Sequence, residues 1–336
     1  MSFFKRFRIA SLALRRGFEL FATILLVLAL LPLRVLPWGL AMRLARLYGY
    51  ACCALWPLAR RVAIINLRRA YGDDMDYRKA SRLTWQVFAS QIQSVAEALQ
   101  FARRWRKTAA GRLDSPWSIE DPQLEDRVLA DPRSKILVTG HLGSWLLALK
   151  IAGRSVGPTA GGVILRAPEN PFVMWPLRRM GLASAAQSIE KRGAVAECLR
   201  RLEQGRSIAL LLDEEGYAHS PFVQFFGRAA ATQKTAALLS LETGSPIVVG
   251  ALFRVRGASA FRYRLAVIEP EQYRESADPV VAITQEITRI LESWIRDYPA
   301  QWRWMHWRWR RRPDRTMETY TRKCLKECFE NRPGSA

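Results

Sequence analysis

The hydrophobic pattern of this chain changes in character after Pro132. Before it, apolar residues recur at helical spacing over 36–70 and about 77–107. After it, short aliphatic runs alternate with helical stretches. Strands are predicted at 136–139, 161–165, 207–212, 246–253 and 262–268, and helices at 145–153, 171–180, 193–204, 233–243 and 279–297. This alternation predicts an α/β fold with a mostly parallel central sheet flanked by helices.

Two connecting regions interrupt the pattern. Pro116, Pro122 and Pro132 predict a loop-rich passage before the first strand. Residues 221–231 predict an aromatic loop that ends near Thr232, the predicted N-cap of the next helix. Its aromatic residues would line an apolar tunnel or simply pack in the core, and the sequence leaves both open. The residues concerned are Phe225 and Phe226, together with Gly227.

The amino terminus combines a basic start with an apolar run from Leu20 to Leu33. No small-residue cleavage site follows, as a signal peptide would require. The run is shorter than the ~20 apolar residues of a full span, so we expect an uncleaved membrane-attached helix with a cytoplasmic amino terminus. We predict a membrane-anchor segment at 1–40, an α/β domain at 41–320 and a polar tail at 321–336.

Charge and cysteine content limit the partners and the cellular compartment that we expect for this protein. Lys and Arg total 52 against 30 Asp and Glu, giving a net charge of +22. This excess favours an acidic partner: nucleic acid, an anionic membrane or an acidic carrier protein. Residues 301–313 mix Trp and Arg densely, which suits base stacking or a membrane interface. Of these two interpretations, the apolar amino terminus favours the membrane interface. The five cysteines form no disulfide framework, as is typical of a reduced, cytosol-facing protein.

One of the three histidines, His141, follows the apolar run 136–139 and a glycine. That position is the turn between a strand and a helix, where α/β proteins place reactive groups. A neutral imidazole there is suited to remove a proton from a hydroxyl group. A histidine that only caps or packs the turn is the alternative, and this segment alone does not decide between them.

Further candidates follow two other predicted strands. Arg166 would hold a phosphate or stabilise developing negative charge, and Asn170 caps a helix or contacts substrate. Asp213, Glu214 and Glu215 follow the strand 207–212, on the side where α/β sheets bind ligands. A solvated acidic turn is the alternative for these three carboxylates.

Taken in order, five segments resemble the bacterial lipid A biosynthesis acyltransferases, the lauroyl and myristoyl branch of the lysophospholipid acyltransferase-like families. Each is similar to a motif of that family: an early "RR…NL…F" segment, "GHFGNWE", "RPxxNP", "DQ…FFGxPAxT" and a closing "YPEQWxWxHRRW". In this chain they are Arg60–Tyr71, Gly140–Trp145, Arg166–Pro171, Leu212–Thr232 and Tyr298–Trp309.

The resemblance implies a membrane-attached acyltransferase on the cytoplasmic face of the bacterial inner membrane. It would move a fatty acyl group from an acyl-carrier-protein or CoA thioester to a hydroxyl of a lipid A precursor or related anionic glycolipid. It implies no cofactor, no metal and no nucleic acid. His141 would be the base, Arg166 a charge stabiliser or phosphate ligand and Asp213 a supporting residue. Asn170, Glu214 and residues 225–227 would contact substrate.

The chain departs from that family at Leu146, where the family carries the acidic partner of the histidine. The carboxylate in such a pair fixes the imidazole tautomer and stabilises the imidazolium. One hypothesis is that Asp213, Glu214 or Glu215 replaces it from the neighbouring strand. The alternative is a catalytically degenerate relative that binds lipid or acyl carrier protein. Glu214 also stands where the family has an amide.

Overall fold

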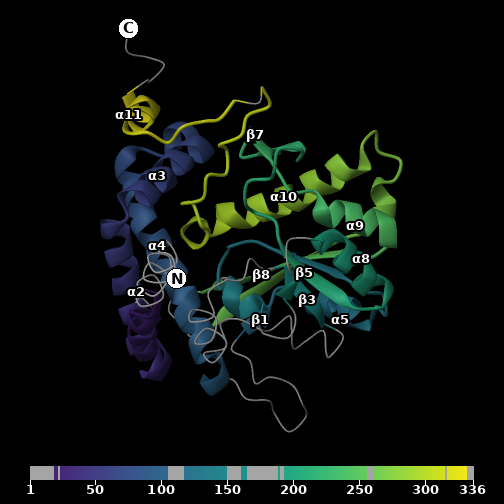
Figure 1. Ribbon diagram of the computed structural model, residues 1–336, viewed down its shortest axis with the longest axis horizontal. Helices are drawn as coiled ribbons and strands as arrows, with labels where there is room; N and C mark the ends of the chain where they lie inside the picture. The colour runs from purple at the N-terminus through teal and green to yellow at the C-terminus, as the bar shows by residue number, and fades with distance from the viewer. Residues whose placement is uncertain are drawn as a thin grey trace, which may run out of the picture.

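A seven-stranded sheet forms the centre of the molecule (Figure 1). The structure is a computed structural model that describes residues 19–21, 23–104, 117–149, 160–164, 188–189, 193–255, 260–314 and 316–330. Its strand order is β1-β9-β8-β2-β5-β3-β4, and only the pair β8–β9 is antiparallel. The strands are β1 (Trp117–Ile119), β2 (Ile136–Thr139), β3 (Ala160–Ile164), β4 (Ser188–Ile189), β5 (Ser207–Leu211), β8 (Ile247–Arg254) and β9 (Phe261–Ile268). The predicted mostly parallel α/β fold is confirmed.

Helices cover the sheet and form a separate layer beside it (Figure 1). The pair α2 and α4 packs closely, α3 packs against α4, and α11 packs against α3. The helix α10 contacts α9, and α8 also contacts α9. The helices are α2 (Trp38–Leu55), α3 (Pro57–Tyr71), α4 (Tyr77–Arg104), α5 (Pro122–Ala130), α8 (Ala194–Glu203), α9 (Thr235–Thr243), α10 (Pro279–Asp297) and α11 (Arg322–Glu330). The division at residues 40 and 320 stays a prediction.

The pleat of the central strands sorts their side chains between two faces. Ile136 and Val138 of β2 belong to the main core, to which α3, α4, α8, α9 and α10 contribute. Leu137, between them, points to the opposite face, beside the short helix 145–149. A strand that is buried on both faces has apolar residues at successive positions. This is why the central strands could be predicted from the sequence.

The stretch 36–70 is helical as predicted, whereas the proline-rich passage is more regular than predicted. The stretch 36–70 is two helices, because Pro57 opens a new helix after Trp56. The proline-rich passage contains β1 and α5, and Pro122 occupies the first turn of α5 behind the N-cap Asp121. Prolines fit a helix start, where their missing N–H needs no partner.

The aromatic stretch 221–231 is also more regular than predicted. It forms a hairpin of β6 (Phe222–Phe225) and β7 (Arg228–Ala231), turning at Phe226 and Gly227 with positive φ. Thr232 does not cap α9, which begins at Thr235 with no side-chain cap. The Thr232 hydroxyl instead donates to the Ala230 carbonyl.

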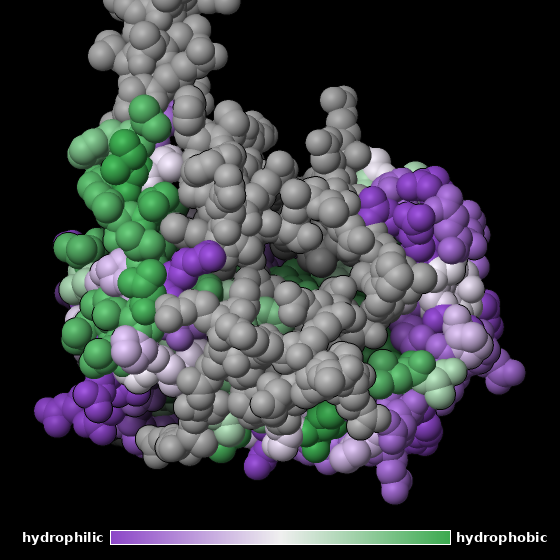
Figure 2. Space-filling view, turned by 90° about the horizontal axis from the view of Figure 1, so that it is seen from below, coloured by the Kyte–Doolittle hydropathy of each residue, from purple (hydrophilic) through white to green (hydrophobic). Residues whose placement is uncertain are grey.

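Apolar side chains are exposed along the amino-terminal helices. Residues 23–35 are helical and continue toward α2 through a short break at 36–37. Figure 2 shows apolar side chains gathered along one side of the molecule. Exposed members include Leu20, Phe21, Ile24, Leu25, Leu28, Leu31, Leu40, Leu47, Leu55, Trp56 and Leu58. No helix in the described ranges is both long and apolar enough to cross a bilayer.

Candidate active site

The turn after β2 is fixed by backbone contacts on both sides. Gly143 donates its N–H to the Gln301 carbonyl at 2.8 Å, and Ser144 donates to Leu252 at 2.6 Å. Gly143 has φ +62°, and a Cβ there would lie 2.2 Å from the Leu252 oxygen. Only glycine fits that position, because both the backbone conformation and the close approach exclude a side chain. The turn therefore holds His141 rigidly at the carboxyl edge of the sheet.

Asp213 brings its carboxylate to His141 from the adjacent parallel strand. In the register of β2 and β5, Thr139 pairs with Leu211, so His141 and Asp213 follow two residues later at the same edge. Asp213 Oδ1 lies 3.0 Å from His141 Nδ1. Asp213 Oδ2 accepts the backbone N–H of His141 at 2.8 Å. One carboxylate thus fixes both the backbone and the ring of the histidine.

Asp213 is held as an anion by its surroundings. Burial by itself opposes ionisation, but the charge and the ring N–H of His141 outweigh it and hold the pKa of the Asp213 carboxyl well below its usual range. Arg303 lowers that pKa further, as does the Trp302 indole N–H, which donates to Oδ2 at 2.9 Å. An ionised carboxylate at Nδ1 keeps the proton on that nitrogen, so Nε2 is the basic atom of the neutral ring.

The comparisons with known proteins identify the chemistry of this family. The model of the bacterial lipid A biosynthesis acyltransferases matches residues 4–311. The chain belongs to this family. The phosphatidylinositol mannoside acyltransferase of Mycolicibacterium smegmatis is 26% identical over 223 residues, which cover 64% of this chain and 71% of that protein. The resemblance found in the sequence is confirmed, and the chain is an acyltransferase.

A second group of charges lies beside His141 in the acyltransferase. Glu214 forms an ion pair with Arg303, and its Oε1 lies 3.8 Å from His141 Nδ1. Glu214 Oε2 lies 3.8 Å from Nε2 of His306. Burial and the nearby arginine Arg303 lower the pKa of His306 to about 3, so this second imidazole is neutral at cytosolic pH.

A buried ion pair stabilises the turn that carries His141. Glu97 of α4 is fully buried, and its Oε2 lies 2.9 Å from Nη1 of Arg254 at the end of β8. The Ser144 hydroxyl also donates to Glu97 Oε2. Gln301 also belongs to this network, because its side-chain amide forms two hydrogen bonds with the backbone of Arg254. This network links α4, β8 and the closing segment, residues Tyr298–Trp309, to the histidine turn.

The other predicted site residues of the acyltransferase fall in different places. Phe225 and Phe226 are 2% and 5% exposed and pack with tryptophans of the closing segment, while Gly227 is exposed at the hairpin turn. Leu146 is half-buried in the helix 145–149. Arg166 and Asn170 lie outside the described residues. Substrate contacts of all these residues stay predictions.

Sequence reasoning missed several residues around the histidine. Trp302 and Arg303 reach it from the closing segment, where Arg303 donates its backbone N–H to the His141 carbonyl at 3.2 Å. The dense Trp and Arg pattern of that segment was a signal, but it pointed to a membrane interface. Glu97 gave no signal at all. In the described ranges, no group of three His, Cys, Asp or Glu side chains is arranged to hold a metal ion.

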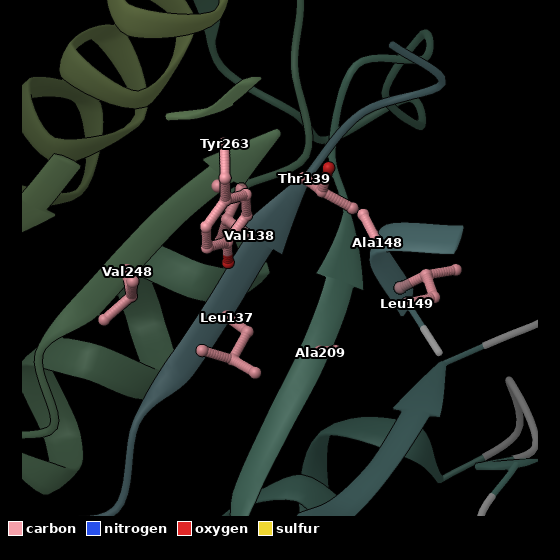
Figure 3. A pocket seen from close by; sticks show the side chains of 9 residues that line it. Leu137, Val138, Thr139, Ala148, Leu149, Ala209, Val248 and Tyr263 are labelled. Carbon is pink, nitrogen blue, oxygen red and sulfur yellow. The ribbon is translucent and has the colours of Figure 1, made fainter. Parts of the chain in front are cut away.

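A small apolar cavity lies against β2 on the face of the sheet beside the helix 145–149 (Figure 3). Its volume is about 30 Å³, and its lining includes Leu137, Ala148, Leu149, Val248 and Tyr263. A cavity of this volume has room for a few water-sized groups, since one water molecule needs about 10–15 Å³ on the same measure. The cavity as it stands therefore does not accommodate an acyl chain.

Proposed function

We propose that this acyltransferase moves a fatty acyl group from a CoA or acyl-carrier-protein thioester to a hydroxyl of a lipid A precursor or related anionic glycolipid. The family match and the name of the mycobacterial relative, a phosphatidylinositol mannoside acyltransferase, support a glycolipid acceptor. The observation that carries the chemistry is the contact of 3.0 Å between Asp213 Oδ1 and His141 Nδ1.

In the proposed reaction His141 is the general base. Its Nε2 takes the proton of the acceptor hydroxyl as that oxygen attacks the thioester carbonyl carbon. The new C–O bond forms, the C–S bond breaks, and the imidazolium returns its proton to the departing thiolate. Asp213 stabilises the imidazolium between these two steps and replaces the carboxylate that the family has at position 146.

Electrostatics support the proposed substrates. The net charge of +22 attracts an acidic carrier protein and an anionic lipid. Arg166, which follows β3 by two residues in the sequence, is proposed to contact the acceptor phosphate or the developing oxyanion. The reaction needs no cofactor besides the thioester donor, which is a co-substrate.

Acyl transfer in vitro tests this function. Palmitoyl-CoA and palmitoyl-acyl carrier protein serve as donors, with a lipid A precursor and phosphatidylinositol mannoside as alternative acceptors. His141→Ala is expected to lower kcat by about 10³-fold or more. The matched control is His219→Ala, because His219 is an exposed histidine outside the site. Full activity of His141→Ala would overturn the base assignment. Binding without transfer by the folded wild-type protein would establish the degenerate-relative alternative.

We propose that the exposed apolar side chains of the amino-terminal helices attach the enzyme to the cytoplasmic face of the inner membrane. Leu55 and Trp56, at the end of α2, are 83% and 59% exposed, and Arg43 and Arg46, earlier in the same helix, are exposed cations. A helix with exposed apolar side chains and exposed arginines lies in the headgroup region with its arginines on lipid phosphates.

Vesicle co-sedimentation tests the attachment. Vesicles with anionic lipid should bind the protein more tightly than vesicles of phosphatidylcholine alone. The double change Leu28→Glu and Leu55→Glu should weaken sedimentation, whereas Leu129→Glu, at an exposed leucine of α5, should not. Equal sedimentation of both variants would contradict this surface.

A further inference from the structure

The ion pair of Glu214 and Arg303 lies directly beside the histidine. Both side chains are about one-third exposed, at 33% and 30%. Arg303 is anchored there by its backbone, which donates to the His141 carbonyl at 3.2 Å. Its guanidinium pairs with Glu214, which places a positive charge close to the ring that becomes an imidazolium during proposed catalysis.

An uncompensated cation at this place would oppose proton transfer. Two like charges within about 4–6 Å disfavour each other's charged state. Asp213 is already engaged by the ring of His141, its backbone N–H and the Trp302 indole. The charge of Asp213 also acts on Arg303, but the carboxylate in direct ion-pair contact with Arg303 is that of Glu214, whose Oε1 also lies 3.8 Å from His141 Nδ1.

We propose that Glu214 is a positioning residue that neutralises Arg303 beside His141, so that the imidazolium forms next to an ion pair of zero net charge. The inference rests on the proposed role of His141 as base. It assigns Glu214 an electrostatic role in the reaction in place of direct contact with substrate.

Other titratable and charged groups also surround the histidine. Asp213 contacts its ring, and the neutral His306 lies beside Glu214. Among the farther groups, Glu215 pairs with Arg310 and Glu97 pairs with Arg254. The charges of Asp213 and Glu215 act on buried Arg308, which donates to the Ala231 carbonyl and the Thr232 hydroxyl. Changes at Glu214 and Arg303 thus act first on their own ion pair, and the charge of Arg303 also acts on Asp213 and His306.

A double-mutant cycle read as the pH profile of kcat/KM tests the proposal. Glu214→Gln leaves Arg303 unbalanced, which disfavours the imidazolium, so the acid limb should move down by about one pH unit. Arg303→Met leaves Glu214 unbalanced, so that limb should move up by about the same amount. The double variant should return to the wild-type position.

The remote ion pair of Arg133 and Glu269 provides the matched control. Both residues lie at the opposite edge of the sheet, where β2 begins and β9 ends. Glu269→Gln should leave the acid limb unmoved. Shifts of the same sign in both single variants, or no return in the double variant, would overturn the neutralising role. If His141→Ala kept full activity, the base assignment would fail instead, so the two failures are distinguishable.

Discussion

Asp213 accepts the backbone N–H of His141 at 2.8 Å while its other oxygen lies 3.0 Å from the ring Nδ1 of the same residue. This double contact fixes where the ring stands and which nitrogen carries the proton. Position 146 holds a leucine, so the carboxylate reaches the histidine from β5 and not from the following helix. The geometry leads to a prediction at each of the two positions.

Asp213→Asn should lower kcat by about 10²- to 10⁴-fold, because an amide neither fixes the tautomer nor stabilises the imidazolium. Leu146→Glu should not raise activity, since Nδ1 is already occupied by Asp213. Steady-state acyl transfer under the conditions used for the His141 variant measures both effects. A large gain from Leu146→Glu would show that the wild-type enzyme lacks a working carboxylate and would contradict the pair described here.

Gly140→Ala should disturb the same contact without altering either partner. A Cβ at Gly140 would lie 2.9 Å from both Cβ and Cγ of Asp213, so the carboxylate must shift. A displacement near 1 Å at a catalytic group lowers the rate by about 10²-fold. Gly39→Ala is the control, because a Cβ there meets no atom within 4 Å. Equal kcat for the two variants would show that Asp213 tolerates the displacement.

Much of this arrangement was predictable from sequence because parallel strands end at a common edge. His141 and Asp213 each follow an apolar run, so their proximity was one hypothesis among three carboxylates. The register of β2 with β5 selects Asp213, and the sequence does not encode that register locally. The central strands and α10 were recognisable from their apolar runs and helical spacing.

Other parts were not predictable, since they depend on contacts between distant segments. The Asn66 side chain donates to the carbonyls of Trp304 and His306, which binds α3 to the closing segment. Trp302 and Arg303 belong to the same segment, which Gly143 and Arg254 also hold through Gln301. The hairpin β6–β7 was mistaken for a loop because its strands have four residues each and turn at Phe226, a non-glycine residue with positive φ.

The buried pair of Glu97 and Arg254 should behave asymmetrically under mutation. Glu97→Ala leaves the largely buried Arg254 without its carboxylate and should lower the free energy of unfolding by about 3–5 kcal/mol. Replacing both residues by Met should be much milder, because apolar side chains of similar volume need no partner. Urea unfolding followed by circular dichroism measures both. A double variant as unstable as Glu97→Ala would show that packing, not charge, sets the loss.

His306 should make the protein sensitive to mild acid. Burial first, and then the positive charges of Arg303 and Arg308, lower its pKa to about 3, whereas an unfolded histidine titrates near 6.5. Below pH 6.5 the unfolded state binds a proton that the folded state does not. The contribution of His306 to the free energy of unfolding is therefore fully present above pH 6.5 and is lost as the pH falls toward 3.

At pH 5 the loss amounts to about 2 kcal/mol, since each pH unit corresponds to about 1.4 kcal/mol. Urea unfolding at pH 7.5 and pH 5 should show a drop in wild type that is smaller by this amount in His306→Gln, a side chain that does not titrate. His219→Gln, at an exposed histidine, should keep the wild-type drop. The same pH dependence in His306→Gln and wild type would mean that His306 is protonated in the folded protein, and a cation would then lie beside Glu214 together with Arg303.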